Sequence, residues 1–183
     1  MIDMVSAPLM RSGITGGAGW KVAMSTLTSE RGAAAGVGAV ASSESPMTAV
    51  QQVIELAKST RRNGRTVWDD PVWRDRIVKL YERTEASMQN ARRARIKELN
   101  GGAMRIPLQG KLVGSEVGQE LGEVALGILG LRSSLYVGDE NAVDDGRWPL
   151  AYMNSYTGTI SGGSSEIQRN ILGERVLGLP KTK

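Results

Sequence analysis

The carboxylate best placed for chemistry in this sequence belongs to Glu30, in the segment Thr28-Ser29-Glu30-Arg31. At about 100° per residue it falls inside an apolar helical stripe, between Leu27 and Ala34. An anion facing a low-dielectric interior is costly, so we expect a raised pKa, which suits a general base working near neutrality. The alternative is a Glu30–Arg31 pair on a helix surface or at a domain contact, and periodicity alone favours that commoner arrangement.

A second candidate is the turn Ser161-Gly162-Gly163-Ser164-Ser165-Glu166, which opens the last helical segment. Paired glycines let another group come close to the backbone, and a helix N-terminus presents unpaired N–H groups to anions. Ser164 can also be a simple N-cap, which is the commoner explanation for such a turn. Taken alone, the turn leaves both possibilities open.

A third candidate is a set of clustered arginines: Arg61, Arg62, Arg65, Arg92, Arg93 and Arg95. Nucleic-acid binding would need interleaved aromatic residues or a recognisable motif, and neither accompanies them, so a solvated face is the commoner role. The acidic loop around Asp144 does not have the spacing of an EF-hand loop, and we expect no metal there.

Two residue types are missing, and their absence narrows the chemistry. The sequence contains no histidine and no cysteine. This excludes Ser-His-Asp and Cys-His nucleophile systems, and zinc sites of the Cys/His type, within this chain. Acid–base chemistry must therefore come from Asp, Glu, Lys or Tyr. The net charge of +4 and the pI near 9.6 are compatible with a phosphate-bearing ligand.

The sequence shows no pattern typical of a membrane span or a secretory signal peptide. No apolar run approaches the roughly 20 residues of a membrane span. The first ten residues lack a basic segment and include Asp3, so we expect no signal peptide. The absence of cysteine gives no hint of an oxidising compartment, and the expected location is the cytoplasm.

These candidates require helices to position them. Asp70 and Pro71 predict a helix start, because Asp caps free N–H groups and Pro fits the first helical position. No stretch alternates at period two, and no hairpin dipeptide separates two β-rich runs. The expected fold is all-α, an up-down antiparallel bundle of four or five helices. The helical stretches are predicted at about residues 20–41, 50–57, 71–91, 107–128 and 167–172, with a short segment at 148–156 before the last of them.

Two segments together resemble the C-terminal domain of the acyl-CoA dehydrogenase family. Gly19-Trp20-Lys21-Val22-Ala23-Met24, leading into Glu30-Arg31, resembles the opening of that domain's first long helix. Residues 162–172, with the sequence Gly-Gly-Ser-Ser-Glu-Ile-Gln-Arg-Asn-Ile-Leu, and residues 174–180 resemble its closing signature. Both occur in the family's order at about the family's separation, so the resemblance spans residues 17–180.

The resemblance implies α,β-dehydrogenation of an acyl-CoA thioester. In the family a glutamate removes the α-proton, the β-hydrogen leaves as hydride to the flavin N5, and an electron-transferring flavoprotein accepts the electrons. Many members carry that glutamate where this sequence has Gly162. The isovaleryl-CoA, long-chain and many actinobacterial types carry it on the first long helix before an arginine. By this resemblance Glu30 is the base, Arg31 lies near the substrate or CoA, and Gly162 is the small residue opposite.

The resemblance also implies flavin contacts. Ser164 and Glu166 match positions that contact FAD in the family. The family's Arg-x-x-Phe-Gly should fall near Arg61-Arg62-Asn63-Gly64, where the Phe is absent and the Arg is out of register. Its Gln-x-x-Gly-Gly falls on Gly127-Ile128-Leu129-Gly130, without the Gln. Both departures predict a weakened hold on FAD.

Family enzymes place an N-terminal helical domain and a middle β-domain before this one. The expected organisation is therefore a flexible segment at residues 1–16 and the helical domain at residues 17–183, with the other two domains absent. Flavin and thioester normally lie between the middle and C-terminal domains, so the isolated chain should be inactive. The alternative is a non-catalytic structural or oligomerisation subunit, or a truncated remnant. The family usually assembles through this domain, which predicts a homo- or hetero-oligomer.

Overall fold

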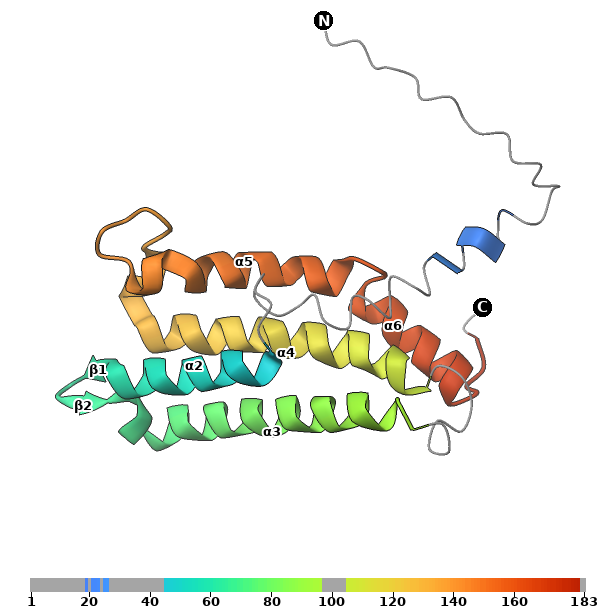
Figure 1. Ribbon diagram of the computed structural model, residues 1–183, viewed down its shortest axis with the longest axis horizontal. Helices are drawn as coiled ribbons and strands as arrows, with labels where there is room; N and C mark the ends of the chain where they lie inside the picture. Colours follow the sequence, from blue (N-terminus) through green and yellow to red (C-terminus); the bar gives the residue numbers. More distant parts are fainter. Residues whose placement is uncertain (1–18, 20, 24, 27–44, 97–104, 182–183) are drawn as a thin grey trace, which may run out of the picture.

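The computed structural model describes residues 19, 21–23, 25–26, 45–96 and 105–181, with side chains described from residue 109 in the last range. Four helices lie side by side and alternate in direction (Figure 1). They are α2 (Pro46–Ser59), α3 (Pro71–Arg93), α4 (Arg105–Leu129) and α5 (Arg147–Ile160). The shorter α6 (Ser165–Ile171) follows α5 and leads into the π-helical turn η5 (Leu172–Val176). The predicted all-α up-down bundle is confirmed.

Helix starts follow the local capping chemistry. The Ser45 hydroxyl accepts a hydrogen bond from the backbone N–H of Thr48 at 3.2 Å, and Pro46 occupies the first turn of α2. At α3, Asp70 Oδ1 accepts from the N–H of Val72 at 2.8 Å, as its sequence predicts. The predicted helix at residues 20–41, which carries Glu30 and Arg31, lies mostly outside the described residues.

A small β-hairpin corrects the expectation of no hairpin. Strand β1 (Arg61–Arg62) pairs antiparallel with β2 (Arg65–Thr66), in the register Arg61↔Thr66. Asn63 and Gly64 have φ of 49° and 80°, the positive values that a two-residue type I′ turn needs at both central positions. The signal was the Asn-Gly dipeptide, which was missed because arginines rather than β-formers flank it. The 3₁₀ turn η1 (Val67–Asp69) then leads to α3.

Glycines on α4 let α5 approach closely. They recur every four residues, at 110, 114, 118 and 122, and therefore share one face of the helix. At Gly122 an added Cβ would lie 2.9 Å from Tyr152 Cδ2 and 3.1 Å from Tyr152 Cα, so a side chain there would push α5 away. The high glycine content of the bundle thus has a packing reason at this position.

The core lies between the four helices. Its buried members from α2 are Ala49, Val50, Val53, Leu56 and Ala57; the others are Val67, Ile77, Leu80, Val117, Leu121, Val124, Ala125, Ile128, Leu129 and Trp148. Burial of such aliphatic side chains stabilises a fold by roughly 1.5–3 kcal/mol each. Within the described residues, no helix combines the length and apolar character needed to cross a bilayer.

The acidic loop ends in the 3₁₀ turn η4 (Val143–Gly146), where Asp144 and Asp145 have positive φ of 50° and 54°. Asp144 Oδ2 accepts a hydrogen bond from Trp148 Nε1 at 2.8 Å and lies 3.6 Å from Arg147 Nε. The loop therefore anchors the start of α5. Among the described residues, no group of three or more His, Cys, Asp or Glu side chains is placed to hold a metal.

Candidate functional site

The turn that joins α5 to α6 is built on two consecutive glycines. Gly162 has φ of 66° and Gly163 has φ of 104°, conformations that side chains with a Cβ rarely adopt. An added Cβ on Gly163 would also lie 2.9 Å from Gln168 Nε2. The glycine pair predicted as a place of close approach is therefore required by the backbone path of the turn.

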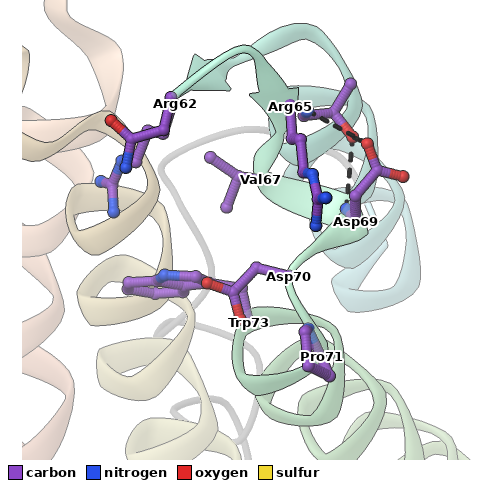
Figure 2. A pocket seen from close by; sticks show the side chains of 9 residues that line it. Arg62, Arg65, Val67, Asp69, Asp70, Pro71 and Trp73 are labelled. Atoms are coloured by element: carbon purple, nitrogen blue, oxygen red, sulfur yellow. Dashed lines mark hydrogen bonds between the residues drawn. The ribbon is translucent and has the colours of Figure 1, made fainter.

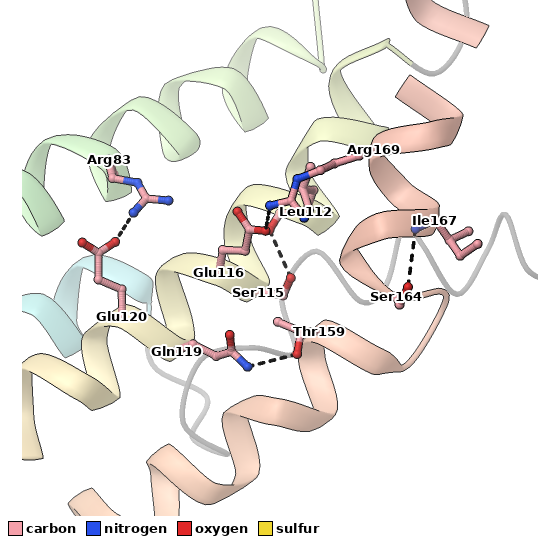
Figure 3. A network of polar contacts seen from close by, with 10 residues as sticks. All are labelled: Arg83, Leu112, Ser115, Glu116, Gln119, Glu120, Thr159, Ser164, Ile167 and Arg169. Atoms are coloured by element: carbon pink, nitrogen blue, oxygen red, sulfur yellow. Dashed lines mark hydrogen bonds and ion pairs between the residues drawn. The ribbon is translucent and has the colours of Figure 1, made fainter. Parts of the chain in front are cut away.

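Ser164 and Glu166 form the capped start of α6. The Ser164 hydroxyl accepts a hydrogen bond from the N–H of Ile167 at 3.4 Å (Figure 3). The pKa of Glu166 lies below its usual range. The main cause is a hydrogen bond with the Ser164 side chain, and a backbone hydrogen bond is the second. Glu166 is therefore a carboxylate at neutral pH, and the N-cap interpretation of Ser164 is confirmed.

Two buried side chains hold the turn from beneath. Lys111 on α4 donates from Nζ to the carbonyl of Gly163 at 2.6 Å, and Gln168 on α6 donates from Nε2 to the carbonyl of Gly162 at 2.9 Å. Both residues are 0% exposed. Sequence reasoning missed both. The one signal was a lysine set beside Leu112 in an otherwise apolar stretch of α4.

Two ion pairs and one amide hydrogen bond fix α4 to α3, α5 and α6 near this turn (Figure 3). Arg169 of α6 pairs with Glu116, and Arg83 of α3 pairs with Glu120, one turn farther along α4. Gln119 Nε2 donates to Thr159 Oγ1 of α5 at 3.0 Å. Because one face of α4 engages α3, α5 and α6, the position of the turn is set by the whole bundle.

The basic residues Arg61 and Arg62 lie at the other end of the bundle, in the β1–β2 hairpin (Figure 1). Arg62 donates from Nη2 to the carbonyls of Gly127 and of Ile128, the latter at 2.8 Å. Its guanidinium carbon lies 5.5 Å from the ring centroid of Trp73. A cation at these last carbonyls complements the negative end of the α4 dipole.

The two glycines matched to the later flavin motif pack against the chain's own side chains. An added Cβ on Gly127 would lie 2.3 Å from Trp73 Cη2. Gly130 has φ of 61°, and its added Cβ would lie 3.0 Å from Arg62 Nη2. Both glycines therefore serve the docking of the hairpin and α3 onto the end of α4.

A pocket of about 710 Å³ opens beside the hairpin (Figure 2). Its lining carries both signs of charge, from Arg62 and Arg65 and from Asp69 and Asp70. Hydrogen bonds from the Thr66 side chain, and to a lesser degree from its backbone, lower the pKa of Asp69. Asp69 is therefore an anion in this pocket. This mixed lining is not the uniformly cationic surface that an isolated phosphate site would present.

The predicted site residues fall into two groups. Gly162, Ser164 and Glu166 come together in one turn after α5. Arg61 and Arg62 lie in the β1–β2 hairpin that follows α2, at the opposite end of the bundle (Figure 1). Glu30 and Arg31 lie outside the described residues. Within one copy of the chain, the described members do not form a single pocket.

Comparisons with known proteins agree with this architecture. The family description "Acyl-CoA dehydrogenase, C-terminal domain" matches residues 17–177. The chain is 37% identical over 165 residues to acyl-CoA dehydrogenase IpdE1 of Mycolicibacterium smegmatis, covering 90% of the chain and 38% of the relative. It is 34% identical over 168 residues to the IpdE1 of Mycobacterium tuberculosis, covering 90% and 39%. The solved ChsE4-ChsE5 complex from Mycobacterium tuberculosis shares the fold, with a TM-score of 0.69, 23% identity, and coverage of 91% of this chain and 41% of that one.

An up-down helical bundle closed by a double-glycine turn and a short capped helix is the architecture of an acyl-CoA dehydrogenase C-terminal domain. The chain belongs to the acyl-CoA dehydrogenase family. It spans about two fifths of the length of the curated relatives it matches: the matched segments cover 38% and 39% of those proteins.

Proposed function

We propose that this chain provides the C-terminal helical domain of an FAD-dependent acyl-CoA dehydrogenase, with Glu30 as the base that removes the α-proton of an acyl-CoA thioester. The observation that supports the proposal is the residue type at position 162. Many family members carry the glutamate there, whereas this sequence has a glycine, with a positive φ of 66°, and no carboxylate. Glu30-Arg31 matches the family's other arrangement, in which the glutamate lies on the first long helix.

The remaining predicted residues have roles in this proposal. Arg31 and Gly162 contact the acyl-CoA, while Ser164, Glu166, Arg61 and Arg62 contact FAD. When bound, FAD supplies the hydride acceptor. The Ser164 hydroxyl and the ionised Glu166 can accept hydrogen bonds from ribose or ring N–H groups, and the exposed Arg61 can pair with a diphosphate. Arg62 already donates to two carbonyls and fits FAD less well.

Assembly is part of the proposal. The described flavin residues lie at opposite ends of one bundle, which supports sites completed by other domains and by a second subunit (Figure 1). We infer a homo- or hetero-oligomer in the cytoplasm that passes electrons to an electron-transferring flavoprotein.

The test is Glu30→Gln in the enzyme assembled with its other domains. Loss of the base should lower turnover by roughly 10²–10⁴-fold, the usual contribution of general-base catalysis. Flavin absorbance should stay, since the substitution leaves the proposed FAD contacts intact. Glu140→Gln, in the exposed acidic loop, is the matched control and should keep normal turnover. Near-normal turnover of Glu30→Gln would show that another group is the base.

A second candidate function is a structural subunit without catalysis. The observation that favours it is the use of Arg62 and Trp73 within the chain, where they pack on Gly127 and Gly130, the glycines matched to a flavin motif. In this case the chain would assemble with its partner, and the flavin chemistry of the complex would not depend on Glu30.

A further inference from the structure

Lys111 is a charged side chain buried in the bundle, with 0% of its surface exposed. Removing an ammonium from water is costly unless a polar partner compensates for the lost hydration. Its Nζ lies 2.6 Å from the carbonyl oxygen of Gly163, a short charge-assisted hydrogen bond. The bond links α4 to a turn 52 residues away in the sequence. The buried positions around Lys111 are Leu112 and Val117, which are apolar, and Ser115, which is small and polar.

Gln168 holds the preceding carbonyl, that of Gly162, at 2.9 Å. Two consecutive carbonyls are therefore held by buried donors from two different helices. All peptide bonds of the described residues are trans, so each N–H points opposite to the carbonyl of the same peptide group. Fixing the carbonyls of Gly162 and Gly163 thus fixes the N–H groups of Gly163 and Ser164, which point away from the two buried donors.

Glycine pairs need such restraints. Gly162 and Gly163 have φ of 66° and 104°, and glycine loses more conformational freedom on ordering than any other residue. The Arg169–Glu116 ion pair anchors α6 beyond the turn. Catalytic geometry must be held within roughly 0.5 Å, and groups that touch no substrate commonly supply that restraint.

We propose that Lys111 is a positioning residue, which orients the peptide groups from Gly162 to Ser164 toward the acyl-CoA and the flavin. The proposal rests on the proposed function, in which Gly162 and Ser164 contact these two ligands. It assigns Lys111 no contact with either ligand, and its effect passes through the Gly163 carbonyl.

The first test uses Lys111→Met, which keeps the length and apolar stem and removes the ammonium. Lys79→Met, on the exposed face of α3, makes the same change and is the matched control. We expect the amide resonances of Gly163 and Ser164 to shift and their hydrogen exchange to accelerate at least about tenfold in Lys111→Met, with the control unchanged. A turn that matches the control in both measurements would overturn the proposal.

A chemical rescue keeps the proposal testable if Lys111→Met does not fold. The chain contains no cysteine, so Lys111→Cys introduces a unique thiol. Aminoethylation of that thiol before refolding restores an ammonium at nearly the length of lysine, whereas propylation gives a side chain of similar length without charge. Recovery of the turn resonances with the ammonium alone is the expected result. Equal recovery with both groups would overturn the proposal, since shape would then suffice.

Kinetics of the assembled enzyme distinguish a positioning role of Lys111 from a role in folding alone. We expect Lys111→Met to retain flavin and to lower kcat at least about tenfold, with rescue by the aminoethylated Lys111→Cys. A normal kcat beside a disturbed turn would overturn the role in catalysis. Failure of Glu30→Gln to reduce turnover would instead contradict the proposed base and leave the resonances of the turn unaffected, so the two failures are distinguishable.

Discussion

Ser164 and Glu166 form the cap of α6, and both are also proposed to contact FAD. The Ser164 hydroxyl accepts from the N–H of Ile167 and also bonds with the Glu166 carboxyl, which lowers the pKa of Glu166. An anion in the first turn of a helix is favoured by the helix dipole. The same carboxylate is one of the residues proposed to contact FAD, so the cap keeps it ionised and oriented before any ligand arrives.

The pH dependence of stability follows from this pair. A carboxyl whose folded pKa is depressed contributes stability above its unfolded pKa, about 4.5, and loses it as the pH falls through the lower folded pKa. Glu166→Gln should therefore reduce the loss of stability between about pH 5 and pH 3. Urea unfolding at both pH values measures this, with Glu140→Gln in the exposed loop as control. An unchanged pH dependence in Glu166→Gln would contradict the assigned bond with Ser164.

At the scale of elements, the end of α4 is held by a side chain from the hairpin. Arg62 donates to the carbonyls of Gly127 and Ile128, and its guanidinium stacks near Trp73 of α3. The last carbonyls of a helix have no partners within the helix, so a cation there satisfies them and complements the dipole. The hairpin, α3 and α4 thus meet at one guanidinium.

Arg62→Met should destabilise the bundle by about 1–3 kcal/mol, because it leaves half-buried carbonyls without a charged donor. Arg61→Met is a close control. Both arginines are exposed, but the Arg61 change leaves the bonds from Arg62 to α4 in place, and exposed substitutions usually stay within about 0.5 kcal/mol. Denaturant unfolding of both variants compares the two free energies of unfolding. Equal effects would show that the bond to α4 contributes little.

At the scale of the whole molecule, the two groups of proposed flavin residues lie at opposite ends of the bundle (Figure 1). The chain spans about two fifths of the length of the curated relatives it matches. In the proposed function, the bundle therefore presents one wall of a site whose other walls come from further domains and subunits.

This arrangement predicts that the purified chain, mixed with FAD, shows no protein-bound flavin band. The same chain assembled with the other domains of the family should show that band, and a saturated acyl-CoA should bleach it. Visible absorption spectra of both preparations make the comparison. Tight binding by the chain alone would contradict the need for partners, and bleaching that persists in Glu30→Gln would favour the structural-subunit alternative.

Much of the fold could be predicted from local sequence patterns. Apolar periodicity located α3 and α4, Asp70 and Pro71 marked the start of α3, and Ser164 marked the start of α6, because capping depends on residues only a few positions apart. The opening segment at residues 19–31 and the closing signature at residues 162–180 together predicted the family, which the family match confirms. The hairpin at Asn63-Gly64 was missed, although its signal is local, because its flanking arginines do not look like strands.

Only the tertiary structure decided which distant groups meet. The bond from Lys111 to Gly163 spans 52 residues, and the bonds from Arg62 to the end of α4 span 65 and 66. The spacing of apolar residues does not predict such pairs. A lysine that will be buried and one that will be exposed are the same letter in the sequence, and only the packing of the helices decides which of them loses its water. The amino-acid sequence by itself therefore determined the helices, their caps and the family. Helix packing decided which polar side chains hold the turn from Gly162 to Ser164. The physical reason is burial: an unpaired polar group is costly only where water is removed, and there it needs a specific hydrogen-bond partner.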